Sequence, residues 1–364
     1  MGKWQRFKTD TRVTVKKTQR LAVDANASDS AESMASVRQA AELLRSGGTV
    51  AFPTETVYGL GANALDEAAV QAIFDAKQRP AWDPLIVHVA SEEQLRLVAG
   101  EIPPNGRLLM EAFWPGPLTL LLPKSLRVPA IVTASRSRIG VRMPGHPVAR
   151  RLIELAGVPV AAPSANSFGR TSPTRAEFVL QDLDGRIDAV IDSGDSSLGL
   201  ESTVVDVCEE PPTLYRPGMV TFQQVQAVCG TLLAYREPLD AASMPQTQPS
   251  PGLGLKHYSP RARLILLEGA DAESERVMRL AEQLQADGDA VGIMLPGDLS
   301  RGAFSRPGLI YRWGDLEDQE ALARRLFAGL RELDAAGATV ILCPLPEDKG
   351  LGVAIRDRLL KAAR

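Results

Sequence analysis

The chain has 364 residues, of which 45% are hydrophobic and 23% are charged, a composition typical of soluble globular domains. At about 150 residues per domain, this length predicts two domains, with one or three as the alternatives. The formal net charge is -3, which argues against a protein built mainly to coat nucleic acid or an anionic membrane.

The first 20 residues contain seven Lys or Arg and one acid, without the apolar core of a signal peptide, so we do not expect export. Because the segment has few acidic residues, a transit peptide is an alternative interpretation. The alternation of Val13 and Val15 with charged residues fits an edge strand or a frayed terminus better. No run approaches the roughly 20 apolar residues that a membrane span needs, so we expect no membrane association.

The three cysteines, Cys208, Cys229 and Cys343, are scattered along the chain without paired spacing. This pattern disfavours a disulfide framework or a zinc site. We expect buried thiols in a reducing compartment, and therefore a cytoplasmic protein.

The first two thirds of the chain mix predicted helices and strands. Helical spacing over 31–46 ends at Gly47 and Gly48, and Asp66 can cap a helix over 67–78. Thr174 and Glu177 predict a capping box for a later helix. The remaining predicted elements are strands at 49–53, 85–89, 118–122, 138–143, 158–162, 188–192, 202–207 and 213–216, a helix between Pro147 and Gly157, and a helix from Thr221 to about Cys229.

The composition changes at 237–260, a segment with five prolines and little hydrophobic periodicity. This segment predicts a linker. A strand–helix rhythm follows and predicts a small parallel sheet with flanking helices. Its predicted strands are 262–267, 290–295, 308–313 and 338–343, and its helices are 271–286, 316–336 and 351–363. We expect a basic extension or first strand at 1–30, a first domain at 31–236, the linker, and a second domain at 261–364.

Cationic side chains gather at the ends of two predicted elements. In strand 138–143, the two-residue period places Arg138, Gly140 and Arg142 on one face, as a cationic shelf or as an ordinary solvated face. Lys77 and Arg79 end the helix at 67–78, where the helix dipole alone also favours cations. We expect the charged ends of Lys77, Arg79 and Arg142 to face a solvated cavity.

The loop at 161–174 (AAPSANSFGRTSPT) is rich in hydroxyl and amide groups and contains no acid. It leaves a strand and enters a helix N-terminus, where backbone amides lack internal partners and bind anions. Ser164, Asn166 and Ser172 can all donate, although turn and cap chemistry explains part of the run. A second polar group, Glu201, Ser202 and Thr203, precedes a buried strand.

Arg216 ends a strand, and His88 lies in a strand where it shares a face with Ile86. A lone strand histidine is more often structural than catalytic. Together these positions predict a pocket for a polar, polyanionic ligand, with phosphate as the expected anion. No Walker A loop, Rossmann fingerprint, nucleophile elbow or zincin motif is present.

The ordered set of short motifs is more specific than any one of them. It consists of PTETVYGLG (53–61), KQRP (77–80), DPLIVH (83–88), WPGPLT (114–119), VRMPGHP (141–147), APSAN (162–166), LESTVVD (200–206), YRPG (215–218) and HYSP (257–260). In this set the chain resembles the threonylcarbamoyl-AMP synthase family, built on the YrdC-type domain, in its long two-domain form. The likeness is dense over about 33–230 and thinner beyond.

The resemblance implies an α/β fold: a YrdC-like twisted mixed sheet with a deep positive cavity, followed by a smaller Rossmann-like parallel α/β domain. It implies that L-threonine, bicarbonate and ATP yield threonylcarbamoyl-AMP and pyrophosphate, with Mg²⁺ on the ATP phosphates. It also implies a partner transferase that moves the threonylcarbamoyl group to tRNA, giving threonylcarbamoyladenosine, and leaves room for a weak tRNA contact.

The resemblance also implies roles for single residues. The positions that match L-threonine contacts are Thr56, His88, Arg142, Ala162 and Ser202. The positions that match nucleotide contacts are Arg79, Asp83, Arg138, Ser164, Ser172, Arg216 and Tyr258, with an arginine at 138 where the family has a small hydroxyl residue. Lys77 and Arg79, with Ser164 and Asn166, match the KxR and SxN pairs, so Lys77, Arg79 and Asn166 are the expected catalytic residues.

The chemistry needs no protein nucleophile, because the carbamate oxygen of the substrate attacks the α-phosphate. Catalysis would come from positioning and charge stabilisation. Two rival functions remain: a non-catalytic module that binds double-stranded RNA or tRNA, and a carbamoyl-adenylating enzyme with another acceptor. Because Lys256, His257 and Tyr258 end the linker, we also expect it to close over the cavity as a lid, with a passive tether as the alternative.

Overall fold

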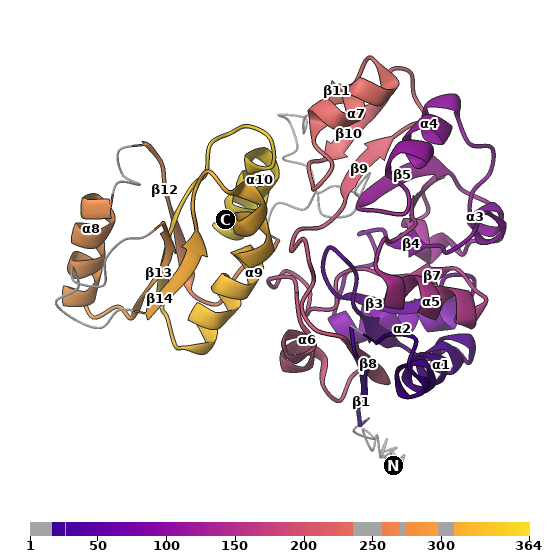
Figure 1. The fold of residues 1–364 in the computed structure, drawn as a ribbon, viewed down its shortest axis with the longest axis horizontal. Helices are drawn as coiled ribbons and strands as arrows, with labels where there is room; N and C mark the ends of the chain where they lie inside the picture. Colours follow the sequence, from indigo (N-terminus) through magenta and orange to yellow (C-terminus); the bar gives the residue numbers. More distant parts are fainter. Residues whose placement is uncertain (1–16, 26, 236–256, 270–273, 298–308) are drawn as a thin grey trace, which may run out of the picture.

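The computed structural model describes residues 17–25, 27–235, 257–269, 274–297 and 309–364. Two sheets form the molecule, and Figure 1 shows them as the centres of two lobes joined side by side. The larger sheet has eleven strands in the order β1-β8-β2-β3-β7-β4-β6-β5-β9-β10-β11 and contains both parallel and antiparallel pairs. The smaller sheet has four strands in the order β12-β15-β13-β14, all parallel.

The strands of the large sheet agree closely with the expected positions, although their order in the sheet is not their order in the chain. Two further strands, β3 and β11, were not among the expected ones, whereas β1 lies in the segment 1–30 that was expected as a basic extension or first strand. The strands are β1 (Gln19–Ala22), β2 (Val50–Phe52), β3 (Gly59–Asn63), β4 (Ile86–His88), β5 (Leu118–Pro123), β6 (Arg138–Arg142), β7 (Val160–Ala161), β8 (Ala189–Asp192), β9 (Thr203–Asp206), β10 (Thr213–Arg216) and β11 (Leu233–Ala234).

Helices cover both faces of this sheet. In β2, Val50 and Phe52 pack with α1 (Ala31–Arg45) and α5 (Pro147–Ala156), whereas Ala51 belongs to the core on the other face. That second core holds the remaining helices of the large lobe. They are α2 (Glu67–Lys77), α3 (Glu92–Val98), α4 (Pro104–Phe113), α6 (Ala176–Leu183) and α7 (Phe222–Cys229), with a 3-10 turn at Ala130–Thr133.

Local capping explains where most of these helices begin and end. Asp66 accepts from the amides of Ala68 and Ala69 at the start of α2, and Gly157 in the left-handed region ends α5. The expected capping box at α6 is wrong. The N-cap of this helix is Arg175 and not Thr174, and a guanidinium has no acceptor for the first amides; the Glu177 carboxylate contacts Arg20 of β1 instead.

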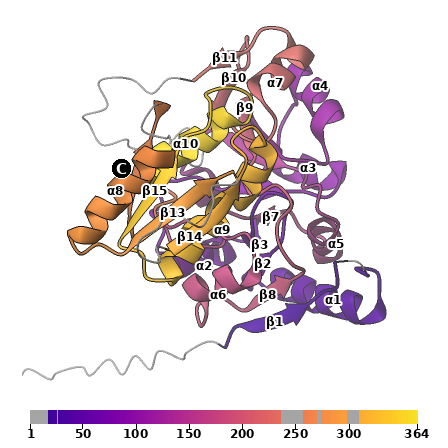
Figure 2. The ribbon, with the colours of Figure 1, turned by 60° about the vertical axis from the view of Figure 1, so that its left-hand side comes forward.

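The small lobe has the predicted strand–helix alternation and a parallel sheet. Its α9 and α10 cover the face of the sheet that looks toward the large lobe, and α8 covers the far face (Figures 1 and 2). The elements are β12 (Arg263–Leu267), α8 (Ser274–Ala286), β13 (Val291–Pro296), β14 (Leu309–Gly314), α9 (Gln319–Ala335), β15 (Val340–Pro344) and α10 (Gly352–Ala362).

Several expectations fall outside the described residues: Val13, Val15 and most of the linker, including Lys256. All three cysteines are free; Cys343 is buried, but Cys208 and Cys229 are only half-buried, so the expectation of three buried thiols is wrong for those two. No helix in the described ranges is both long enough and apolar enough to cross a membrane.

Candidate active site

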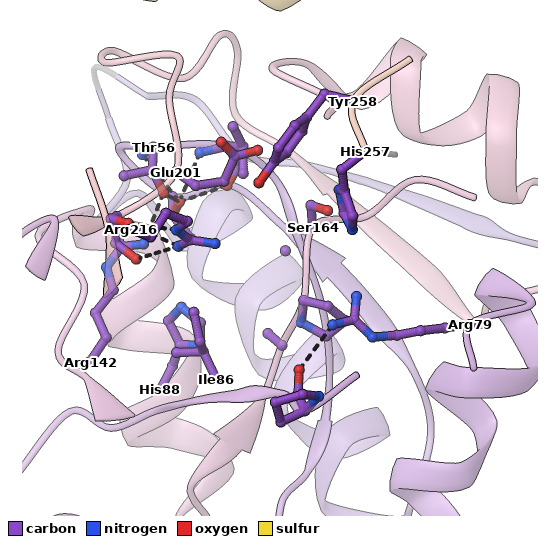
Figure 3. A pocket seen from close by; sticks show the side chains of 17 residues that line it. Thr56, Arg79, Ile86, His88, Arg142, Ser164, Glu201, Arg216, His257 and Tyr258 are labelled. Carbon is purple, nitrogen blue, oxygen red and sulfur yellow. Dashed lines mark hydrogen bonds between the residues drawn. The ribbon is translucent and has the colours of Figure 1, made fainter. Parts of the chain in front are cut away.

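A cavity lies where strands of the large sheet begin and end, against the small lobe. The space between its walls, including the open mouth, is about 570 Å³. Figure 3 shows its side chains converging from separate loops and strand ends. The lining residues are Thr54, Thr56, Val57, Gly59, Arg79, Pro84, Ile86, His88, Arg142, Ala162, Pro163, Ser164, Glu201, Ser202, Arg216, His257 and Tyr258.

Arg142, the last residue of β6, is buried at one side of this cavity. Its guanidinium donates through Nε to the carbonyl of Gly116 at 3.1 Å and through Nη1 to Thr56 Oγ1 at 2.9 Å. Its Nη2 lies 2.6 Å from Glu55 Oε1, which also accepts from the Gly145 amide. Burial alone would raise the pKa of Glu55, but Arg142 and this amide outweigh it and hold the pKa below its ordinary value.

All five residues matched to L-threonine contacts line the cavity: Thr56, His88, Arg142, Ala162 and Ser202. Strand pairing explains the grouping of two of them, because β4 and β6 run parallel with His88 opposite Arg142. These side chains set an arginine beside hydroxyl groups. A site of this kind can hold the carboxylate and hydroxyl of a small amino acid.

His88 is neutral in this environment. Burial is the main cause, and the charge of Arg142 adds to it; together they lower the pKa of His88 to about 3. Its ring stands edge-on to Phe52, with 6.1 Å between the ring centroids. A neutral imidazole at the wall adds no positive charge and can donate one hydrogen bond and accept another.

Arg79 lies on the other side of the cavity and is held by the turn that follows α2. Gln78 takes the left-handed conformation that ends this helix, and Arg79 donates to the carbonyls of Asp83 and Pro84 at 3.2 and 2.9 Å. Its Nη2 is 2.9 Å from Asp83 Oδ2. Asp83, matched to a nucleotide contact, therefore stands behind the wall as the partner of Arg79.

The expectation that the charged end of Lys77 faces a solvated cavity is wrong. Lys77 is 1% exposed and donates to the carbonyls of Ser164, at 2.6 Å, and Asn166. Asn166 is also buried behind the wall, where its Nδ2 donates to the carbonyls of Ser167 and Arg170. Lys77 and Asn166 thus hold the loop that presents Ser164 to the cavity.

Few hydroxyl groups of the loop at 161–174 reach the cavity. Only Ala162, Pro163 and Ser164 line it. Ser172 lies behind them and donates to Glu201 Oε1 at 2.5 Å. The N-terminus of α6 contributes no residue to the lining of this cavity.

Arg216 reaches the cavity from the end of β10. Its Nε and Nη2 donate to the Ser202 carbonyl at 3.1 and 2.9 Å, and Nη2 also donates to Ser202 Oγ at 3.1 Å. Gly218 permits this close approach of two chain segments, since a Cβ there would lie 2.4 Å from the Thr203 amide nitrogen. Burial lowers the pKa of Arg216 from its ordinary value.

Arg138 does not line the cavity. At the opposite end of β6, its guanidinium contacts Asp206 and lies 2.7 Å from Glu209. The expected cationic shelf is therefore divided: Arg142 faces the cavity, while Arg138 pairs with carboxylates of β9 and the loop after it. At this position, where the resemblance led us to expect a small hydroxyl residue, the arginine has carboxylate partners of its own.

Several lining residues were missed as site residues. Thr54 donates to the carbonyl of Val57 at 2.6 Å and so fixes the loop that carries Thr56. Glu201 and His257 were expected near the site, in the polar group with Ser202 and at the end of the linker with Tyr258, but neither was among the residues matched to a substrate. Gly59, Pro84, Ile86 and Pro163 line the cavity chiefly through their place in the fold.

Comparisons with known proteins show to which family the chain belongs. A family model described as telomere recombination matches residues 42–218, and one described as threonylcarbamoyl-AMP synthase, C-terminal domain, matches 220–364. A threonylcarbamoyl-AMP synthase of Pyrococcus abyssi is 44% identical over 328 residues, which are 90% of this chain and 94% of the relative. The chain belongs to the threonylcarbamoyl-AMP synthase family.

Further relatives agree. A threonylcarbamoyl-AMP synthase of Bacillus subtilis is 42% identical, over 90% of this chain and 92% of the relative. Among solved structures, that of P. abyssi Sua5 complexed with L-threonine has a TM-score of 0.86 at 42% identity, and the match covers 95% of this chain and 98% of that one. The two-domain form predicted from the motifs is confirmed.

The neutral state of His88 predicts a pH dependence of stability. In the unfolded chain His88 binds a proton near pH 6.5, whereas in the folded protein it does so only near pH 3. The unfolding free energy is therefore at its full value above pH 6.5 and decreases as the pH falls below it. We expect wild type to lose about 2 kcal/mol more than His88→Asn between about pH 7 and pH 5. Urea unfolding of both proteins at each pH measures this difference, and equal losses would contradict the assignment.

The contacts of Lys77 predict that its replacement lowers stability as well as turnover. Lys77→Met keeps most of the side-chain volume but leaves the carbonyls of Ser164 and Asn166 without this donor. We expect an unfolding free energy lower by about 2–4 kcal/mol, together with reduced turnover. Denaturant unfolding measures the first quantity. A variant as stable as wild type would show that the loop does not depend on Lys77.

Proposed function

We propose that this protein forms threonylcarbamoyl-AMP from L-threonine, bicarbonate and ATP and releases pyrophosphate. One observation carries the proposal. The residues matched to L-threonine and four residues matched to the nucleotide, Arg79, Ser164, Arg216 and Tyr258, line one and the same cavity. The relatives named threonylcarbamoyl-AMP synthase, and the P. abyssi structure complexed with L-threonine, support it.

The amino-acid end of the cavity would select threonine. Arg142 binds the carboxylate, and the hydroxyl groups of Thr56 and Ser202 are placed to bond the substrate's polar atoms. His88, being neutral, does not attract a second anion to this end. The threonine amine then points into the cavity, where it joins the carbon of bicarbonate to form a carbamate as water leaves.

The second step is a displacement at phosphorus. A carbamate oxygen attacks the α-phosphorus of ATP, the bond to the bridging oxygen breaks, and pyrophosphate leaves with that electron pair. Arg79 and Arg216 face this region and stabilise the negative charge on the phosphoryl oxygens. Because both reacting groups come from substrates, the side chains act by positioning and by charge.

We propose that Mg²⁺ enters with the ATP phosphates. In the described part of the chain, no group of three or more His, Cys, Asp or Glu is placed to hold a metal ion, so phosphate oxygens would supply most of the ligands. The cation would reduce the charge of the leaving pyrophosphate. Further residues matched to the nucleotide, Asp83 and Ser172, would act through Arg79 and Glu201, which they contact.

A carbamoyl adenylate is a mixed anhydride that water can hydrolyse. As the family resemblance implies, we propose that a partner transferase takes it first and moves the threonylcarbamoyl group to a tRNA adenosine. We propose that 31–236, with its YrdC-like sheet, carries the chemistry in the cytoplasm, and that the Rossmann-like 261–364 supports it. The segment 237–260 is proposed as the lid; of it, only 257–260 are described.

The decisive test is pyrophosphate release from purified protein with ATP, Mg²⁺, bicarbonate and L-threonine. We expect release only with all of these present, together with an adenylated carbamate detected by mass spectrometry. Release without threonine or bicarbonate would overturn the proposal. Dependence on another amino acid or amine would favour the carbamoyl-adenylating alternative, and RNA binding without release would favour the RNA-binding module.

Two arginines of β6 provide a matched pair of variants. Arg142→Ala removes the cation at the amino-acid end, and we expect the KM for L-threonine to rise at least about tenfold, equivalent to roughly 1.4 kcal/mol. Arg138→Ala, at the other end of the strand, should lower stability while leaving this KM within about twofold. Steady-state kinetics of both folded variants measure the contrast, and similar values of KM would contradict it.

A further inference from the structure

The small lobe shares a hydrophobic core with the wall of the cavity. Val57, Leu200 and Tyr258 pack in one cluster with residues of α9 and α10. The ring of Tyr258 stacks on Phe327 of α9 at a centroid distance of 5.7 Å and an angle of 22°. Because Val57 and Tyr258 also line the cavity, part of its wall rests on the small lobe.

Arg358 of α10 is the polar centre of this contact. It is 0% exposed and does not itself line the cavity. Its Nε lies 2.8 Å from Glu201 Oε2 and its Nη2 donates to the carbonyl of Pro217 at 3.0 Å. Its Nη1 donates to Asp357 Oδ2 at 2.5 Å, and its guanidinium carbon lies 5.3 Å from the ring centroid of Tyr258. One side chain thus joins the small lobe to two lining residues.

The charge of Glu201 makes this contact electrostatically important. It is a buried carboxylate in the wall of a cavity that, on the proposed function, receives the phosphates of ATP. An uncompensated negative charge there would repel the substrate. Burial alone would raise the pKa of Glu201, but Arg358 and then Arg216 outweigh it and hold the pKa below its ordinary value. The carboxylate is therefore ionised, and the small lobe supplies a cation beside it.

We propose that Arg358 is a positioning residue for nucleotide binding: it cancels the charge of Glu201 and holds Tyr258 at the cavity wall. The small lobe then contributes to the active site through a specific ion pair rather than only by covering it. The inference rests on the proposed function, since ATP is taken as the anion that benefits. In it, Arg358 acts through Glu201 and Tyr258 and touches no reacting atom.

The test measures the dissociation constant of a non-hydrolysable ATP analogue, and separately that of L-threonine, by calorimetry on the full-length protein. In Arg358→Met, Glu201 keeps the hydrogen bond from Ser172 but loses its cation partner, and its charge should weaken ATP-analogue binding at least about tenfold, and L-threonine binding much less. Arg358→Lys keeps a cation and should recover part of the loss. In Arg358→Met/Glu201→Gln, the charge of Glu201 is removed, so binding should return to within about threefold of Glu201→Gln alone.

Leu342→Ala is the matched control for stability. Leu342 is buried against α8 on the far face of the small sheet, so this variant weakens the small lobe without touching the cavity wall. We expect a lower Tm but ATP-analogue binding within about twofold of wild type. If Arg358→Met does not fold, Arg358→Lys is compared with wild type and the double variant with Glu201→Gln. A double variant that binds the analogue much more weakly than Glu201→Gln would then overturn the proposal.

Two results would overturn the proposal. The first is ATP-analogue binding that is equally weakened in Leu342→Ala and Arg358→Met, since general loosening would then explain the loss. The second is a double variant that binds no better than Arg358→Met. Binding of the analogue does not require turnover, so these outcomes are independent of whether pyrophosphate release depends on threonine, which tests the proposed function.

Discussion

The cost of burying cations governs this active site. Arg79, Arg142 and Arg216 are each less than a tenth exposed, and a buried guanidinium is tolerated only where carboxylates and carbonyls compensate it. Each has such partners within the protein: the carboxylates of Asp83 and Glu55, and the Ser202 carbonyl. The guanidinium groups are therefore oriented before any substrate arrives, which is what charge stabilisation in a closed site requires.

This requirement explains the architecture around the cavity. The arginines follow a helix or end a strand, where backbone carbonyls are available to accept from them, and the loops that supply the carbonyls are tied to one another. Lys77 ties the loop after β7 to α2 in the same way. The buried carboxylate of Glu201 is compensated in the same way, but its cation, Arg358, comes from α10 of the small lobe. The two lobes are thus coupled by charge as well as by their shared apolar core.

Sequence patterns predicted most of the elements, but not α3 and α4, and they predicted the site only in part. Periodicity and caps place α1, α2 and α5, but β3 (Gly59–Asn63), with two glycines and an asparagine, has no strand pattern. Motifs assembled from distant segments identify residues such as Arg142 and Ser202, whose neighbours come from strand pairing. They do not show which side chains stand behind the wall, because partners such as Glu201 for Ser172, or Asp206 for Arg138, depend on tertiary packing.

The most direct measurement of the central claim is a pair of crystal structures, one without ligands and one with L-threonine and a non-hydrolysable ATP analogue. If protein partners hold the cations in place beforehand, the guanidinium groups of Arg79, Arg142 and Arg216 should move by less than about 1 Å between the two. The carboxylates of Glu55 and Asp83 should keep their contacts. Arginines that point away from the cavity in the ligand-free crystal, and turn inward only with substrate, would contradict the account.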